Sequence, residues 1–268
     1  MGLADFLKKH PVFTRSELEE FVKEHYSGHP GTLEQLIHYH LARENIGQVK
    51  RGLFYVVERG YTAQDCPVDI MLVTGKMRAD AVLAYHTALD LYGHAHSVYN
   101  RLYFLTKRSK NTETVQFRNY EIKPVQVPKA LLKKGKEQME VKKYDRSGLE
   151  IFVTSRERTL VDMIDRPDLS GGWEEIWRST EGFGFLKMKE LVEYTLALDN
   201  QTTTAKVGFF LEQYREEYGV EAKYLKQLEK HSPAQPRYMD KSFKKATMIS
   251  RWNLIVPDYI LNQEWKEF

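Results

Sequence analysis

Four hydrogen-bonding side chains recur at helical spacing early in the chain, and their chemistry suits the edges of nucleic-acid bases. They are an amide, an imidazole, a phenol and a guanidinium, contributed by Gln35, His38, Tyr39 and Arg43. Groups of this kind reach base edges in the major groove as well as phosphates. A chain that gathers them on one side of a helix is therefore a candidate for DNA binding.

A helix from Thr32 to Arg43 would position these side chains. Thr32 followed by Gln35 forms a capping-box pattern, which is typical of a helix start. Apolar residues recur at helical spacing on the opposite side and predict a core-facing stripe, which consists of Leu33, Leu36, Ile37, His40 and Leu41.

After Asn45 the hydrophobic period changes from helical to alternating, which predicts a β-hairpin. Gly52 marks its turn, and residues 53–57 form a β-rich run. A cationic hairpin tip behind a recognition helix is the arrangement of a winged helix-turn-helix that touches DNA backbone. The alternative is a small α+β scaffold whose hairpin only packs. We assign the DNA contacts to Thr32, Gln35, His38, Tyr39, Arg43, Gln48, Lys50 and Arg51.

Positive charge is concentrated outside this region. Residues 1–57 hold seven basic and seven acidic side chains, whereas residues 101–146 hold thirteen basic and five acidic side chains, a net charge of +8. Clusters of Lys and Arg attract polyanions, although a run of charge is usually a solvated face. The candidate C-terminal basic patch comprises Lys107, Arg108, Lys110, Lys133, Lys134, Lys136, Lys142 and Lys143.

An enzymatic function has weaker support. Glu121 and Lys123 form an E-x-K pair that, with an upstream carboxylate such as Asp90, is able to hold Mg²⁺ for phosphodiester cleavage. Matches of three residues arise often by chance. The chain contains neither a P-loop nor a GxSxG motif, so we expect neither a catalytic site nor a cofactor.

A ligand-sensing domain is a further alternative. Its pocket would be lined by aromatic residues near the strand that follows residue 98, namely Tyr92, Tyr99, Tyr103 and Phe104. Aromatic residues at alternating strand positions are more often part of a core.

Metal binding and disulfides are not expected. The single cysteine, Cys66, excludes an internal disulfide and a multi-cysteine zinc site. The histidines of residues 10–40 lack carboxylate or cysteine partners at ligand spacing, so we interpret them as solvated or capping residues. The chain also lacks an apolar run of about 18 residues and a secretory signal, and we expect a cytoplasmic protein.

The predicted fold is α+β with two domains. Residues 1–57 form the winged helix-turn-helix, with a helix before Pro11, a strand at Val12-Phe13 and a second capping box at Thr14 and Glu17. Residues 58–67 form a linker, and residues 68–268 form a larger mixed domain.

The larger domain is predicted to contain strands and helices in mixed order. A buried helix is expected over residues 80–93, strands over 99–106, 115–127 and 149–154, and helices over 155–165 and beyond Gly171 to His231. Residues 251–256 are expected to return as a strand to a sheet edge. The cations at the start of the 155–165 helix oppose its dipole, and an ion pair from Arg158 to Asp162 is the favoured compensation.

Several of these segments together resemble the AbiEi antitoxins of bacterial AbiE toxin-antitoxin systems. The segments are TRSEL, RGLFYVV, DAVLAYHTAL, SRERTLVD, VGFFLEQY and RWNLIVP, and they span nearly the whole chain. The resemblance implies an N-terminal winged helix that represses its own operon at inverted repeats. It also implies a C-terminal domain that neutralises a nucleotidyltransferase-like toxin, AbiEii, with or without a stable direct complex. It assigns DNA contact to the helix from Thr32 to Arg43 and to Lys50 and Arg51.

Overall fold

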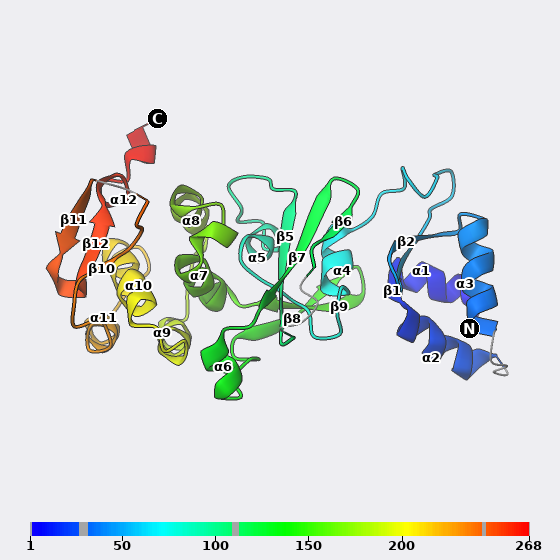
Figure 1. The fold of residues 1–268 in the computed structure, drawn as a ribbon, viewed down its shortest axis with the longest axis horizontal. Helices are drawn as coiled ribbons and strands as arrows, with labels where there is room; N and C mark the ends of the chain where they lie inside the picture. Colours follow the sequence, from blue (N-terminus) through cyan, green and yellow to red (C-terminus); the bar gives the residue numbers. More distant parts are fainter. Residues whose placement is uncertain (1, 27–31, 109–112, 243–244, 268) are drawn as a thin grey trace.

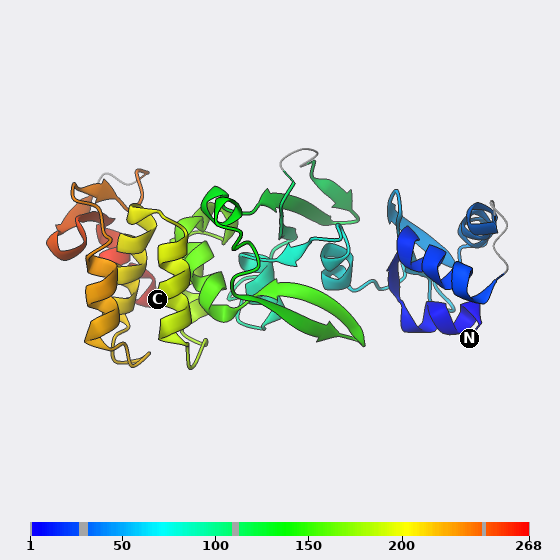
Figure 2. The same ribbon diagram turned by 90° about the horizontal axis from the view of Figure 1, so that it is seen from below.

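The computed structural model describes residues 2–26, 32–108, 113–242 and 245–267. The molecule is elongated, and three parts follow one another along its long axis: an N-terminal part, a central sheet with its helices, and a C-terminal layer of helices with a small sheet (Figure 1; Figure 2). The fold is mixed α+β, as the sequence predicts. Within the described part of the chain, no helix has the length and apolar character needed to cross a membrane.

The N-terminal part consists of three helices and an antiparallel sheet with the strand order β1-β3-β2. The predicted capping box at Thr14 is confirmed. Its hydroxyl accepts a hydrogen bond from the Glu17 amide at 3.2 Å, and the Glu17 carboxylate accepts one from the Thr14 amide at 2.6 Å. The elements are α1 (Leu3–Lys9), β1 (Val12–Thr14), α2 (Arg15–His25), α3 (Thr32–Ala42), β2 (Ile46–Lys50) and β3 (Leu53–Val56).

This small sheet buries both of its faces. Phe13 and Phe54 point into a core shared with the three N-terminal helices. Val12, Leu53 and Tyr55 point the other way, into a second core shared with the central sheet. Alternate strand residues face opposite sides, so one short sheet joins two cores. The N-terminal part is therefore docked on the central part through apolar contacts.

The segment of residues 58–67, which was expected to be a linker, is mostly exposed and contacts this junction through Ala63 and Cys66. Cys66 is fully buried, and its Sγ accepts a hydrogen bond from the Glu58 amide at 3.3 Å. The carbonyl of Ala63 accepts hydrogen bonds from the Tyr55 hydroxyl and, at 3.1 Å, from the Arg118 guanidinium. These contacts fix the segment between the two parts.

The central sheet has six strands in the order β6-β7-β5-β4-β9-β8, with β5/β7 and β4/β9 parallel and the other pairs antiparallel. Leu102 and Phe104 face the core toward α4, whereas Tyr103 and Leu105 face the core toward the C-terminal helices. The elements are α4 (Ile70–Gly75), β4 (Val82–Leu83), α5 (His86–Leu91), β5 (Arg101–Thr106), β6 (Val115–Phe117), β7 (Tyr120–Gln126), α6 (Lys129–Lys133), β8 (Val141–Arg146) and β9 (Leu149–Thr154).

The expected helix over residues 80–93 is wrong. Its first half enters the middle of the sheet as β4, and only residues 86–91 are helical. Tyr85, with φ of +56°, turns the chain between the two. A short apolar run suits a buried strand as well as a buried helix, so the local pattern could not separate them. The expected strand over residues 115–127 is likewise a hairpin, β6 and β7, which turns at Arg118, where φ is +55°.

The C-terminal layer begins with five α-helices and a short 3₁₀ helix, and the α-helices lie within the regions predicted to be helical. A three-stranded sheet follows, in which β12 is the central strand and not an addition to the edge of the main sheet. The elements are α7 (Arg156–Asp165), η1 (Pro167–Leu169), α8 (Trp173–Thr180), α9 (Met188–Ala197), α10 (Gln201–Gln213), α11 (Ala222–Glu229), β10 (Arg237–Tyr238), β11 (Ala246–Ile249), η2 (Ser250–Trp252), β12 (Leu254–Pro257), α12 (Asp258–Leu261) and η3 (Glu264–Glu267).

Candidate functional site

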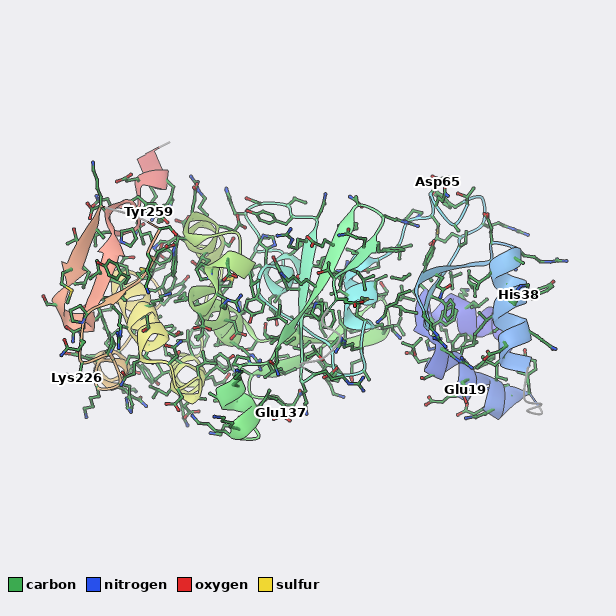
Figure 3. All side chains as sticks on the ribbon, viewed as in Figure 1. Glu19, His38, Asp65, Glu137, Lys226 and Tyr259 are labelled. Atoms are coloured by element: carbon green, nitrogen blue, oxygen red, sulfur yellow. The ribbon has the colours of Figure 1, made fainter. Side chains whose placement is uncertain are left out.

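The outer face of α3 carries the four side chains that the sequence analysis singled out. Gln35, His38, Tyr39 and Arg43 are exposed and border one shallow groove, and His38 lies on the outer side of the helix in Figure 3. The Arg43 guanidinium stacks over the Tyr39 ring at 4.7 Å from its centroid. The opposite face packs against the N-terminal core. Thr32 begins the helix, but its side chain lies outside the described residues.

The hairpin and α3 enclose a second groove of about 540 Å³. Gln48 and Arg51 border it from the hairpin, and His38 borders it from the helix. Arg15 on α2 forms an ion pair of 2.5 Å with Glu34 at the same groove. The structure thus brings the exposed residues of helix and hairpin to one end of the molecule.

Lys50 does not share this position. Its ammonium donates a hydrogen bond of 2.7 Å to the carbonyl of Met77 in the central part. Burial, and secondarily the positive charge of Arg78, lower the pKa of Lys50. Of the two cations expected at a free hairpin tip, only Arg51 is exposed, and Lys50 instead holds the two parts of the protein together.

The candidate C-terminal basic patch is dispersed over the end of β5, the end of α6 and the strand β8, with several residues just beyond these elements, and much of its charge is paired. Ion pairs join Lys107 to Glu137 at 2.5 Å, Lys134 to Asp199 at 3.9 Å, Lys142 to Glu140 at 3.4 Å and Lys143 to Glu150 at 3.0 Å. Arg108, Lys133 and Lys136 are exposed, and Lys110 lies outside the described residues. Helix α6 is distant from α3 along the long axis in both views (Figure 1; Figure 2).

Lys142 and Lys143 lie on the edge strand β8, which the sequence did not predict. Lysines on an edge strand protect it from pairing with other chains, which is a structural reason for their presence.

The positive charge of Arg158 at the start of α7 is compensated by other groups of the protein. The Arg158 Nε donates to the Asp162 carboxylate at 3.2 Å, as predicted, and its Nη1 donates to the Met139 carbonyl at 2.7 Å. Tyr194 donates to the other oxygen of Asp162 at 2.5 Å. Burial raises the pKa of Asp162 despite these two partners. This network ties α7 to α9 and to the turn before β8.

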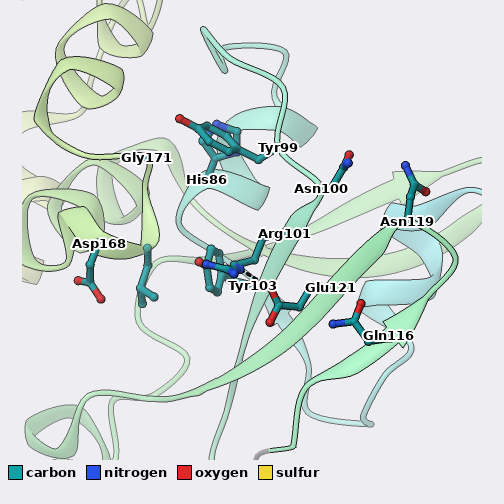
Figure 4. A pocket seen from close by; sticks show the side chains of 11 residues that line it. His86, Tyr99, Asn100, Arg101, Tyr103, Gln116, Asn119, Glu121, Asp168 and Gly171 are labelled. Carbon is teal, nitrogen blue, oxygen red and sulfur yellow. Dashed lines mark hydrogen bonds and ion pairs between the residues drawn. The ribbon is translucent and has the colours of Figure 1, made fainter.

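A cavity of about 400 Å³ lies between β5, β7 and the start of α8 (Figure 4). Tyr99 and Tyr103, two of the four aromatics proposed for a sensing pocket, line it. Phe104 is instead buried in the core toward α4, and the Tyr92 hydroxyl donates to the Thr154 carbonyl at 2.8 Å. Two of the four aromatic residues predicted to line a pocket therefore border this cavity, and the other two do not.

The same cavity bears on the nuclease hypothesis. Glu121 lines it, but its carboxylate is ion-paired with Arg101. Lys123 lies on the same side of β7 as Glu121, and Asp90 is an exposed residue of α5 that is not part of the cavity wall. Glu121 and Asp90 thus do not meet in the cavity as a pair of metal ligands.

Three carboxylates do gather elsewhere in the described part of the chain. Oxygens of Glu140, Glu157 and Glu190 lie within 4.8 Å of one another. Lys142 pairs with Glu140 at 3.4 Å, and Lys187 pairs with Glu190 at 3.1 Å, while the Lys187 amide donates to Glu157 at 3.0 Å. Neighbouring lysines thus balance this acidic group.

A buried carboxylate beside the cavity escaped the sequence analysis. One oxygen of Glu175 accepts hydrogen bonds from His86 Nε2 at 3.2 Å and from the amides of His96 and Ser97 at 2.9 and 3.1 Å. It also accepts one from the Ser179 hydroxyl at 3.0 Å. Burial opposes ionisation, but these bonds outweigh it and lower the pKa of Glu175 to about 2. Three of these four donors belong to residues that are distant from Glu175 in sequence, so no local motif indicates them.

Fold and sites together define an elongated α+β protein with an exposed helix face at one end and a polar cavity in its middle. One solved structure with a similar fold is that of the RV2827C protein from Mycobacterium tuberculosis, with a TM-score of 0.61 and 13% sequence identity over 98% of this chain and 92% of that chain. That likeness concerns the fold alone. The chain matches no model of a protein family and no curated protein.

Proposed function

We propose that residues 1–57 act as a winged helix-turn-helix that binds inverted repeats in the promoter of the protein's own operon and represses it. The observation that carries this proposal is the row of exposed polar side chains on α3, formed by Gln35, His38, Tyr39 and Arg43. This side of α3 is not covered by the central part of the protein. Helix α3 packs on one face of the small sheet, and the central part packs on the opposite face. A helix presented in this way is able to enter a major groove.

The chemistry of these groups suits base readout. Gln and Arg make bidentate contacts with adenine and guanine, respectively, and the stacking of Arg43 on Tyr39 restricts the guanidinium before DNA arrives. Arg51 on the hairpin supplies a backbone contact. Because the N-terminal part has no net charge, base contacts carry a larger share of its affinity than in a strongly basic domain.

We further propose that the protein is a cytoplasmic antitoxin whose remaining residues neutralise a nucleotidyltransferase-like toxin encoded beside it. This part rests on the resemblance to AbiEi antitoxins. The motifs that carry the resemblance supply contacts of the core and of the junction between parts. Leu18 of TRSEL lies in the N-terminal core, and Leu53 and Tyr55 of RGLFYVV lie in the core at the junction.

The DNA-binding proposal is tested by measuring the affinity for the upstream promoter and for random duplex by fluorescence anisotropy. We expect Gln35→Ala and Arg43→Ala each to weaken promoter binding by roughly 1 to 3 kcal/mol, mainly at one base position, and to change random binding little. Arg51→Ala should weaken both alike and reduce the salt dependence.

Arg215→Ala is the matched control, because Arg215 is an exposed arginine of the C-terminal layer. It should leave both affinities unchanged. Equal promoter binding by the wild type and by the Gln35→Ala and Arg43→Ala variants would show that α3 is not the recognition helix.

A further inference from the structure

The charged groups at the cavity between β5, β7 and α8 are already satisfied within the protein. Arg101 is ion-paired with Glu121. The Asp168 carboxylate accepts two hydrogen bonds from Arg166, at 2.9 and 2.8 Å. Both pairs are partly exposed and balance the charges of the wall against each other, so the lining offers no unpaired charge to a charged ligand and favours a neutral one.

Neutral hydrogen-bonding groups on the same walls have no such partners. The carboxamides of Asn100, Gln116 and Asn119 line the cavity, and no side-chain hydrogen bond joins any of them to another described residue. Figure 4 shows them along the side formed by β5 and the β6–β7 hairpin. A carboxamide offers both donors and an acceptor, so these groups suit a ligand whose edge carries both.

Aromatic rings form another wall, and the protein holds it in place. The Tyr99 ring meets the His86 ring edge-on, with centroids 4.4 Å apart. The Tyr99 hydroxyl lies so close to Gly171 that a Cβ there would stand 2.8 Å from it. The His86 Nε2 donates a hydrogen bond to the buried Glu175 carboxylate, which also accepts hydrogen bonds from the backbone amides of residues 96 and 97. Tyr99 is nevertheless 39% exposed, so this wall is held in place but remains accessible.

We propose that this cavity binds a neutral, planar, nitrogen-containing ring with donors and acceptors on its edge, as in a nucleobase. The ring of Tyr99 contacts the ligand's apolar surface, and the carboxamides of Gln116 and Asn119 hydrogen-bond to its edge. The volume of about 400 Å³ lies in the range of small-molecule sites. The base comes either from a free nucleoside or from an unstacked position of a nucleic-acid strand, which proteins read through the same contacts.

The test uses the full-length chain and four probes, adenosine, guanosine, cytidine and uridine. Binding is followed by saturation-transfer NMR at nucleoside concentrations up to about 1 mM, which half-fills a site with a Kd of about 1 mM. We expect at least one nucleoside to bind, and Gln116→Ala combined with Asn119→Ala to weaken it roughly tenfold or more. Gln227→Ala, which removes an exposed carboxamide from α11, is the matched control and should have no effect.

Two further arms complete the test. Phenol, a ring without the edge pattern, should bind more weakly than the preferred nucleoside. A short single-stranded oligonucleotide that binds more tightly than the nucleoside, and loses affinity in the Gln116→Ala, Asn119→Ala variant, would assign the base to a strand. The inference is overturned if no nucleoside or oligonucleotide binds, if phenol binds equally well, or if the double variant binds like the wild type.

Discussion

At the scale of single residues, several hydrogen bonds of charged side chains join positions that are distant in sequence. Glu175 draws its four hydrogen-bond donors from three segments, and Lys50 finds its acceptor in Met77. The Arg158–Asp162 pair, by contrast, spans one helical turn and was predictable from spacing. Local patterns reveal such neighbours along a helix, but they do not reveal which segments the tertiary fold brings together.

Glu175 gives a pH-dependent prediction. Its pKa is lowered from 4.5 to about 2, so its contribution to stability is fully present above about pH 4.5 and is lost as the pH falls toward 2. We expect Glu175→Gln to reduce the free energy of unfolding near neutral pH by up to about 3 kcal/mol. The difference from the wild type should shrink as the pH falls, as measured by urea unfolding.

The neighbouring Glu174→Gln provides a control for that measurement. Glu174 is exposed, and its partner is Arg178 on the same helix at 2.9 Å. Its substitution should leave the acid dependence close to that of the wild type. A constant difference between wild type and Glu175→Gln at every pH would contradict the assignment of the lowered pKa.

At the scale of elements, the hairpin β2–β3 was predictable but its environment was not. The change of period after Asn45 and the turn at Gly52 predicted it correctly. The sequence did not show that the back of this hairpin would be buried by the central part, since Leu53 and Tyr55 look like residues of any small core. Gly47 is more informative about this packing. It lies opposite Tyr55 in the sheet, and its lack of a side chain leaves room for the Tyr55 ring.

A methyl group at position 47 tests this packing. A Cβ there would lie 2.1 Å from Cζ of Tyr55, whose hydroxyl is bonded to Ala63 and whose ring packs edge-on against Phe117. We expect Gly47→Ala to lower the free energy of unfolding by about 1 to 3 kcal/mol, as overpacking does. Urea unfolding measures this change.

Gly2→Ala serves as the comparison for Gly47→Ala. A Cβ at residue 2 would come no closer than 3.8 Å to its neighbour, and the backbone there has a φ of −85°, which any residue adopts. Equal stability of the Gly47→Ala and Gly2→Ala variants would mean that Tyr55 moves freely and that the junction is looser than described.

The C-terminal layer gives a second example at this scale. Two segments of the family resemblance, VGFFLEQY and RWNLIVP, pack on each other: Trp252 lies over Gly208 of α10, and its indole donates to Glu212 at 2.6 Å. The sequence predicted a helix and a strand here, but not that Trp252 is what joins them. The fold class and most helices were thus predictable, whereas β4, β8 and the cavity depend on pairings between distant segments.

At the scale of the whole molecule, the shared core makes the N-terminal part an integral piece of the protein. Removing residues 1–57 would uncover the apolar side chains that pack against Val12, Leu53 and Tyr55, and would leave Lys76 without Glu17, its ion-pair partner. A truncated chain is therefore a poor test of separate functions. Point substitutions on exposed residues separate the two proposed functions without disturbing this core.

We expect two surface variants to behave in opposite ways when the protein is produced with the toxin encoded beside it. Gln35→Ala with Arg43→Ala should lose repression of a promoter reporter and still relieve growth arrest, because both residues lie at the end of the molecule remote from the C-terminal layer.

Lys133→Glu with Lys136→Glu reverses two exposed cations at the end of α6. It should keep repression and lose neutralisation if α6 meets an acidic partner. Lys226→Glu, an exposed lysine on α11, controls for added negative charge, and immunoblots establish equal protein levels. Full rescue by the Lys133→Glu, Lys136→Glu variant would leave those lysines as a solvated surface. Failure of the wild type to relieve arrest would remove the antitoxin proposal while leaving operator binding to be judged on its own.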